Sequence, residues 1–127
     1  MQVEKDFEEL LKLFNNNEVK YCIVGAYAVG FYSKPRYTKD IDVLVEPSRK
    51  NAERIVRALT EFGFGSLDLT ELDFMKKGNI IQLGYEPVRV DVITSLKGSN
   101  FSQIWKNKKV ATYGKTKVFF IGLKELI

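Results

Sequence analysis

Histidine is absent from this 127-residue chain, and cysteine occurs once, as Cys22. Without histidine there is no Ser-His-Asp or Cys-His nucleophile system and no zinc site that uses imidazole. A single cysteine also excludes a four-cysteine zinc site and an internal disulfide. Any chemistry must therefore use carboxylates, lysines, arginines, hydroxyl groups or cations taken from solution.

Long apolar runs are lacking too, because no stretch approaches the roughly 20 apolar residues of a membrane-spanning helix. The acidic start does not resemble a signal peptide, so we expect a cytoplasmic protein that makes no use of a membrane. With 45% hydrophobic and 28% charged residues, the composition is typical of one soluble globular domain. Cys22 lies in an apolar segment and is expected to fill the core.

The net charge of +4 is modest. It is compatible with an anionic ligand, a nucleotide or a nucleic acid, and equally with a solvated surface. No basic run is interleaved with aromatic residues in a recognisable motif, which favours the solvated surface. Phe101, Ile104 and Trp105 are spaced as core residues of a short helix rather than as a platform for stacking bases.

Hydrophobic periodicity and turn signals predict alternating helices and strands. Helices are expected at about 3–15, 25–32, 48–62 and 101–105, with one further turn after Thr70; strands are expected at about 20–24, 40–46, 79–85, 88–94, 109–113 and 116–121. Ser48 is the expected N-cap of the third helix, and Gly63 its stop. Residues 122–127 have the pattern of a helix cut short, so we expect a missing C-terminal extension.

Two aspartates one residue apart, Asp40 and Asp42, open an otherwise apolar strand. Strand side chains alternate, so both acids lie on one face while Ile41 and Val43 lie on the other. Like charges roughly 6–7 Å apart repel each other and resist desolvation, and divalent cations relieve both costs. The alternative is a solvated sheet edge that carries surface aspartates.

A third acid, Asp91, lies on a later strand, and it too points away from a valine face. If the two strands are neighbours, three carboxylates can converge and hold two cations about 4 Å apart. Such a pair of cations serves phosphoryl-type transfer, which needs positioning and charge neutralisation but no histidine. Arg89 is expected on the opposite strand face from Asp91, without a direct ion pair.

Two further features favour a phosphate ligand. Gly25 and Ala26 stand where a strand passes into a helix, and small residues at a helix N-terminus let a phosphate approach the backbone. The alternative for this pair is close packing of helix against strand. A basic loop with Lys34, Arg36, Thr38 and Lys39 precedes the acids and could reach a triphosphate, or could simply be solvated.

The ordered set Val24-Gly25-Ala26, then Pro35 to Asp42, then Arg89-Val90-Asp91 resembles the nucleotidyltransferase superfamily of DNA polymerase beta. Within it, the chain is similar to small stand-alone prokaryotic nucleotidyltransferases, including those related to abortive-infection toxins. The resemblance runs through nearly the whole chain and implies one nucleotidyltransferase domain over residues 1–127. It departs in Ala26, where many members carry Ser or Gly, and in the short C-terminal helix.

The resemblance assigns roles to residues. Asp40, Asp42 and Asp91 would hold two Mg²⁺ ions, which Mn²⁺ could replace, and Asp91 would also orient or deprotonate the acceptor hydroxyl. Gly25 and Ala26 would cradle the triphosphate, with Arg36, Thr38 and Lys39 nearby. The fold implied is α/β (α+β): a mixed, twisted sheet with helices mainly on one face and the active site on the open face.

The activity implied is Mg²⁺-dependent transfer of a nucleoside monophosphate from a nucleoside triphosphate, ATP for example, to a hydroxyl acceptor. The acceptor would be a protein side chain, an RNA 3′ end or a small molecule. One alternative is a non-catalytic nucleotide-binding or antitoxin module, with a toxin or antitoxin protein as its partner. A weaker alternative is a purely structural cation site.

Overall fold

The structure is a computed structural model that describes residues 3–33, 40–85 and 88–126. Its centre is a mixed sheet of six strands in the order β3-β4-β2-β1-β6-β5. The strands are β1 (Tyr21–Val24), β2 (Asp40–Val45), β3 (Ile80–Tyr85), β4 (Val88–Ile93), β5 (Lys109–Tyr113) and β6 (Thr116–Phe120). All six strands expected from the sequence are present.

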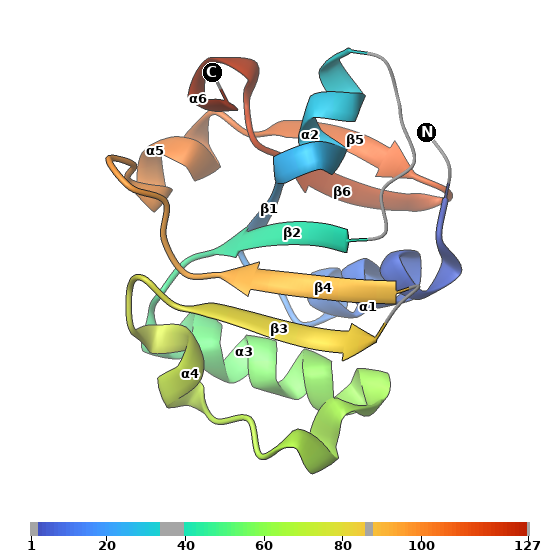
Figure 1. Cartoon of the computed structure of the whole chain (residues 1–127), viewed down its shortest axis with the longest axis vertical. Coiled ribbons are helices and arrows are strands. Elements are labelled where there is room, and N and C mark those ends of the chain that lie inside the picture. The colour runs from blue at the N-terminus through green and yellow to red at the C-terminus, as the bar shows by residue number, and fades with distance from the viewer. Residues whose placement is uncertain (1–2, 34–39, 86–87, 127) are drawn as a thin grey trace.

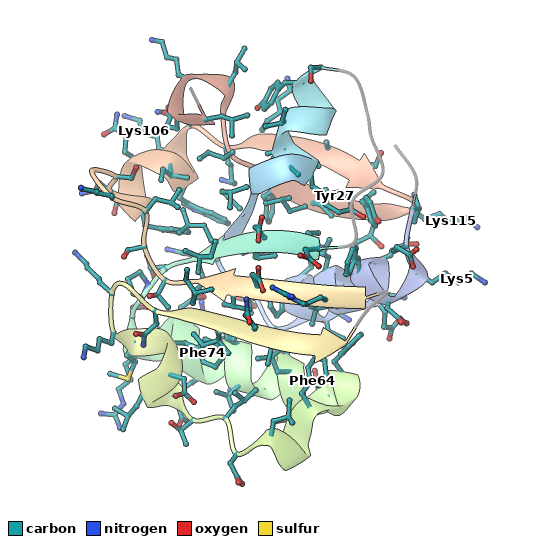
Figure 2. The ribbon with its side chains drawn as sticks, viewed as in Figure 1. Lys5, Tyr27, Phe64, Phe74, Lys106 and Lys115 are labelled. Carbon is teal, nitrogen blue, oxygen red and sulfur yellow. The ribbon has the colours of Figure 1, made fainter. Side chains whose placement is uncertain are left out.

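Helices connect these strands, as expected. They are α1 (Lys5–Asn16), α2 (Gly25–Tyr32), α3 (Arg49–Leu59), α4 (Glu71–Met75), α5 (Phe101–Lys106) and α6 (Leu123–Leu126), with a π turn at Thr60–Phe64 and a 3₁₀ turn at Gly65–Leu67. The two longest, α1 and α3, lie behind the sheet in Figure 1 and contact each other. Phe64 and Phe74 belong to this layer (Figure 2), and Phe74 is fully buried.

Strand pairing brings together segments that are far apart in the sequence. β2 runs antiparallel to β1 and parallel to β4, and β4 runs antiparallel to β3. The β5–β6 hairpin extends the sheet through a parallel contact between β6 and β1. A mixed sheet with helices in this arrangement confirms the expected fold class.

The two faces of β2 and β4 differ in character. Ile41, Val43, Val90 and Val92 are all buried on the face toward α1 and α3. This burial is the main source of stability for the central strands, since each large apolar side chain removed from water contributes roughly 1.5–3 kcal/mol. The opposite face of β4 and β3 has no described helix in front of it in Figure 1.

The short helix α2 leaves β1 without an intervening loop. It contacts both β1 and β2. Tyr27 anchors it in the core, because its ring packs edge-on against Phe7 of α1 at 5.7 Å and Tyr113 of β5 at 6.0 Å. Figure 2 shows Tyr27 between α2 and the β5–β6 hairpin. The amino end of α2 is thereby fixed beside the start of β2.

The expected helix boundaries are also present. Ser48 caps α3 by accepting a hydrogen bond from the Asn51 N–H at 3.2 Å. Thr70 and Asp73 form a reciprocal capping box at α4. Gly63 has a φ of 116°, a conformation that ends the helical run after α3 at a glycine. None of the helices in the described ranges is long and apolar enough to cross a membrane.

Candidate active site

The strand register places the acids of β2 and β4 side by side. Asp42 is the direct partner of Asp91 in the parallel β2–β4 pair, so both side chains leave the same face of the sheet. Asp40 lies on that face as well, two residues before Asp42. All three acids are partly buried. The expectation that Asp91 shares a face with Asp40 and Asp42 is met.

Asp42 and Asp91 form the close pair in this cluster. The pKa of Asp42 is raised to about 6, first by burial, then by the hydrogen bond and like charge of Asp91, and to a smaller extent by repulsion from Asp40. A shared proton is the usual solution when two carboxylates lie this close. The pair is thus poised to exchange a proton for a cation near neutral pH.

We expected all three carboxylates to converge, but only those of Asp42 and Asp91 are in contact. Among the described residues, no group of three or more histidine, cysteine or acidic side chains is close enough to hold one metal ion. Asp40 acts on Asp42 through charge but is not part of the contact pair. The shared face still allows a third ligand, since Asp40 is one strand repeat from Asp42.

Arg89 corrects one expectation. We expected it on the opposite strand face from Asp91, but residues two apart on a strand share a face, and its Nε lies 3.7 Å from Asp91 Oδ1. Both atoms are buried and neither has a hydrogen-bond partner. Arg89 is also the register partner of Asp40, so its positive charge lies among the acids. The alternation of side chains along a strand therefore already predicts that Arg89 and Asp91 share a face.

These orphaned atoms bear on whether the site suits a divalent cation. A buried carboxylate oxygen without a hydrogen bond is costly unless something else satisfies it. Asp91 Oδ1 accepts no hydrogen bond, the Arg89 Nε at 3.7 Å compensates only part of its charge, and a second carboxylate with a raised pKa lies beside it. Oxygen ligands of this kind are the ones that Mg²⁺ and Mn²⁺ prefer. The residues present therefore fit a hard divalent cation held chiefly by Asp42 and Asp91.

Gly25 touches this pair from α2. Its φ is +68°, and a Cβ built on it would overlap Asp42 Oδ2 and come within 3.0 Å of Asp42 Cγ. The carboxylate of Asp42 therefore lies directly against the backbone at the amino end of α2. The N–H groups of that first turn have no partners within the helix and favour an anion. Ala26, next in this turn, is exposed.

Arg36, Thr38 and Lys39, with Lys34, fall in residues 34–39, outside the described ranges. Gln82, which lies in a segment covered by the family resemblance but was assigned no role, is the β3 partner of Asp91 and is exposed on the same face. A cavity of about 250 Å³ lies beyond Leu44 toward Thr94 and Phe101, and none of the three acids lines it.

Removing the Arg89 charge is expected to strengthen cation binding by the acids. In Arg89→Gln, the pKa of Asp42 should rise further, because Arg89 now lowers it. Mn²⁺ should bind about fivefold more tightly, the effect of roughly 1 kcal/mol from one nearby charge. Carboxyl-carbon NMR and Mn²⁺ titration would measure both. Arg49→Gln, an exposed arginine paired with Glu53 on α3, is the control and should change neither.

Comparisons with known proteins agree with this architecture. No protein-family model and no curated protein matches the chain. Among solved structures, it is similar to that of a "putative nucleotidyltransferase" from Thermotoga maritima, with a TM-score of 0.65 and 14% sequence identity. The match covers 94% of this chain and 77% of the other. At this identity the likeness concerns the fold, so the chain has the fold of that Thermotoga maritima protein.

Proposed function

We propose that this protein transfers a nucleoside monophosphate from a nucleoside triphosphate to a hydroxyl acceptor, with Mg²⁺ bound by Asp40, Asp42 and Asp91. The observation that carries the proposal is the contact pair of Asp42 and Asp91, in register on one face, directly beside the amino end of α2. The Thermotoga maritima neighbour, named as a "putative nucleotidyltransferase", supports the same reaction class.

Each part of this site has a task in the reaction. The bound cation would neutralise charge on the triphosphate and on the leaving pyrophosphate. Asp42 and Asp91 hold it, and Asp40 adds a ligand from the same face. The first N–H groups of α2, at Gly25 and Ala26, would donate hydrogen bonds to phosphate oxygens. Arg36, Thr38 and Lys39 are proposed to contact the triphosphate from the loop before β2.

The bond changes balance without further reactants. The acceptor hydroxyl oxygen attacks the α-phosphorus, the bond from that phosphorus to the bridging oxygen breaks, and pyrophosphate leaves with the electron pair. Asp91 would take the hydroxyl proton on its carboxylate, one oxygen of which accepts no hydrogen bond and lies 3.7 Å from the Arg89 Nε. The acceptor is a protein side chain, an RNA 3′ end or a small molecule.

The test is an incubation of the protein with each α-³²P-labelled nucleoside triphosphate, Mg²⁺ or Mn²⁺, and a cell extract that is afterwards separated into RNA, protein and small-molecule fractions. We expect label in one fraction and release of unlabelled pyrophosphate. Label from the γ-position should not be transferred. Nucleotide binding by equilibrium dialysis without any transfer would instead support the non-catalytic nucleotide-binding or antitoxin module.

A further inference from the structure

Positive charge is concentrated in one part of this chain. Residues 97–127 contain seven lysines and a single acid, Glu125, whereas residues 1–96 contain more acids than bases. Most of these lysines belong to α5 and the β5–β6 hairpin or to the segments beside them. The carboxylate site on β2 and β4 lies outside this basic region.

A groove of about 300 Å³ lies at the border of this basic region. Its cations are Lys20, Arg54 and Lys117, and its aromatic side chains are Trp105 and Phe119. These residues come from the segment before β1 and from α3, α5 and β6. One acid, Glu18, also lines it, and Lys20 lies 3.9 Å from Glu46 at its edge. The lining still carries three positive charges to one negative.

The rings in this groove are held in fixed positions with cations around them. Trp105 packs edge-on against Phe119 at 5.2 Å and is stacked on Phe101 at 6.1 Å. Lys108 Nζ lies 3.9 Å from the Trp105 ring centroid, and Lys20 Nζ lies at 6.0 Å. Lys117 Nζ lies 5.7 Å from the Phe119 ring. Trp105 and Phe119 are only partly buried. Because Lys108 lies over the Trp105 ring and Phe101 is stacked on it, a ligand in the groove would contact the remaining exposed part of the indole and the Phe119 ring.

We propose that this groove binds single-stranded nucleic acid. Proteins that bind single strands without strict sequence preference combine a cationic track for the backbone with aromatic side chains that contact the bases. An acidic protein would use the charges but has no comparable need for the rings. The sequence favours a core role for Trp105, and the ring does pack against the core. A bound strand would in addition contact the part of the ring that lines the groove, where cations from segments distant in sequence surround it.

The groove is separate from the carboxylate site. β1 runs from Tyr21, paired with Val45, to Val24, paired with Asp42, so Lys20 and the acids lie at opposite ends of the β1–β2 pair. Three residue steps along a strand span about 10 Å. Binding at the groove thus goes beyond the proposed transfer reaction and does not require it. The Asp42→Asn variant should bind nucleic acid as the wild type does.

Trp105 gives a direct readout, since it is the sole tryptophan of the chain. Titration with twelve-nucleotide oligo(U) or oligo(dT) should quench its fluorescence, and the affinity should fall as salt rises. The triple variant Lys20→Gln/Arg54→Gln/Lys117→Gln should weaken binding at least tenfold. It should also reduce the slope of the logarithm of the affinity against the logarithm of the salt concentration by about two. Comparing the two oligonucleotides distinguishes RNA from DNA; a preference for either one supports the proposal.

A second groove supplies the matched control. It is larger, about 550 Å³, and is lined by Lys5, Lys12 and Lys115 together with Glu8 and Glu9, but by no aromatic residue. Figure 2 shows Lys5 and Lys115 at the opposite edge of the view from Lys106 of α5, and of the described residues only Asn15 lines both grooves. Lys5→Gln/Lys12→Gln/Lys115→Gln removes the same charge and should change the affinity less than threefold. An equal loss in both triple variants would overturn the proposal.

The ring is tested separately by anisotropy of a dye-labelled oligonucleotide. Trp105→Leu should lose about tenfold in affinity, the scale of one base–aromatic contact, while Trp105→Phe should keep most of it. Thermal melting of each variant confirms that it is folded. Wild-type affinity in Trp105→Leu, or equal quenching by poly-glutamate at the same charge concentration, contradicts a nucleic-acid site.

Discussion

Asp42→Asn is expected to reduce nucleotidyl transfer on the order of 10³-fold or more while leaving the fold intact. The scale is that of losing a group that stabilises charge in the transition state. Asn keeps the shape of the side chain and can donate a hydrogen bond to Asp91, but it no longer supplies a negative charge to the cation. Asp91→Asn should have an effect of similar size, because the two acids act as a pair. Initial rates with a labelled nucleotide at saturating Mg²⁺ measure both.

The same variant should be more stable than the wild type in metal-free buffer above pH 6. The pKa of Asp42 in the folded protein, about 6, is above its ordinary value of 3.8, so the folded state holds the proton more tightly than the unfolded state. The free energy of unfolding therefore falls as the pH rises from about 4 through 6, and Asn avoids this loss. We expect a gain of about 1 kcal/mol, after discounting the shift for solvent screening of a partly buried group.

Added Mg²⁺ should reverse that order, since it stabilises only a site that binds it. Melting temperatures with and without Mg²⁺, at pH 5 and pH 7.5, would show this for both proteins. If the wild type without metal were equally stable at both pH values, the pKa of Asp42 would not be raised in the folded protein. Asp68→Asn, on an exposed turn, serves as the charge-matched control.

Gly25→Ala should disable the site by steric means alone. The new methyl group would occupy the space of the Asp42 carboxylate, and the φ of +68° is unfavourable for alanine. We expect a loss of about 2–4 kcal/mol in the free energy of unfolding, combining backbone strain with overpacking. We also expect about a 100-fold lower rate, since a displacement of about 1 Å at a reacting centre has effects of that order.

Gly78→Ala separates the two contributions. Gly78 has a φ of +86°, but a Cβ there would meet nothing within 4 Å. It should therefore lose about 1 kcal/mol for the backbone conformation and retain full activity. Urea unfolding and transfer rates of the two variants provide the comparison. Equal stability losses in Gly25→Ala and Gly78→Ala would show that Asp42 does not lie against the α2 backbone.

The elements of this fold could be predicted because local signals agree with the final structure. Alternating valines fixed which face of β2 and β4 is buried, and Ser48 and Gly63 marked the limits of the helical segment that contains α3. The same alternation placed Asp40, Asp42 and Asp91 on one face once the strands were neighbours. Arg89 follows the identical rule, and our expectation for it was wrong because the period of two was misapplied.

Other features depend on contacts that no local pattern contains. Asn51 is a polar residue on the buried side of α3, where it accepts a hydrogen bond from the Lys20 N–H and donates to the carbonyls of Lys20 and Glu46. It thereby ties the start of β1 to the end of β2. The basic groove is similar, since Lys20, Arg54, Trp105 and Lys117 become neighbours only after four elements have packed together.

The close approach of Gly25 to Asp42 also required the structure. From the sequence, Gly25 has two possible reasons to be a glycine: the approach of a phosphate or close packing of helix against strand. The contact with Asp42 of β2 is a third reason. That contact depends on how α2 leaves β1 and on the antiparallel pairing of Val24 with Asp42. A glycine is thus required there even before any ligand binds.

Joint binding of a divalent cation by Asp42 and Asp91 can be observed by anomalous X-ray scattering from crystals grown with Mn²⁺ and a non-hydrolysable nucleoside triphosphate analogue. We expect a manganese peak within about 2.0–2.4 Å of one oxygen from each carboxylate, with phosphate oxygens completing the coordination. A fully bound nucleotide with no manganese between Asp42 and Asp91, or manganese held at other residues, would contradict it.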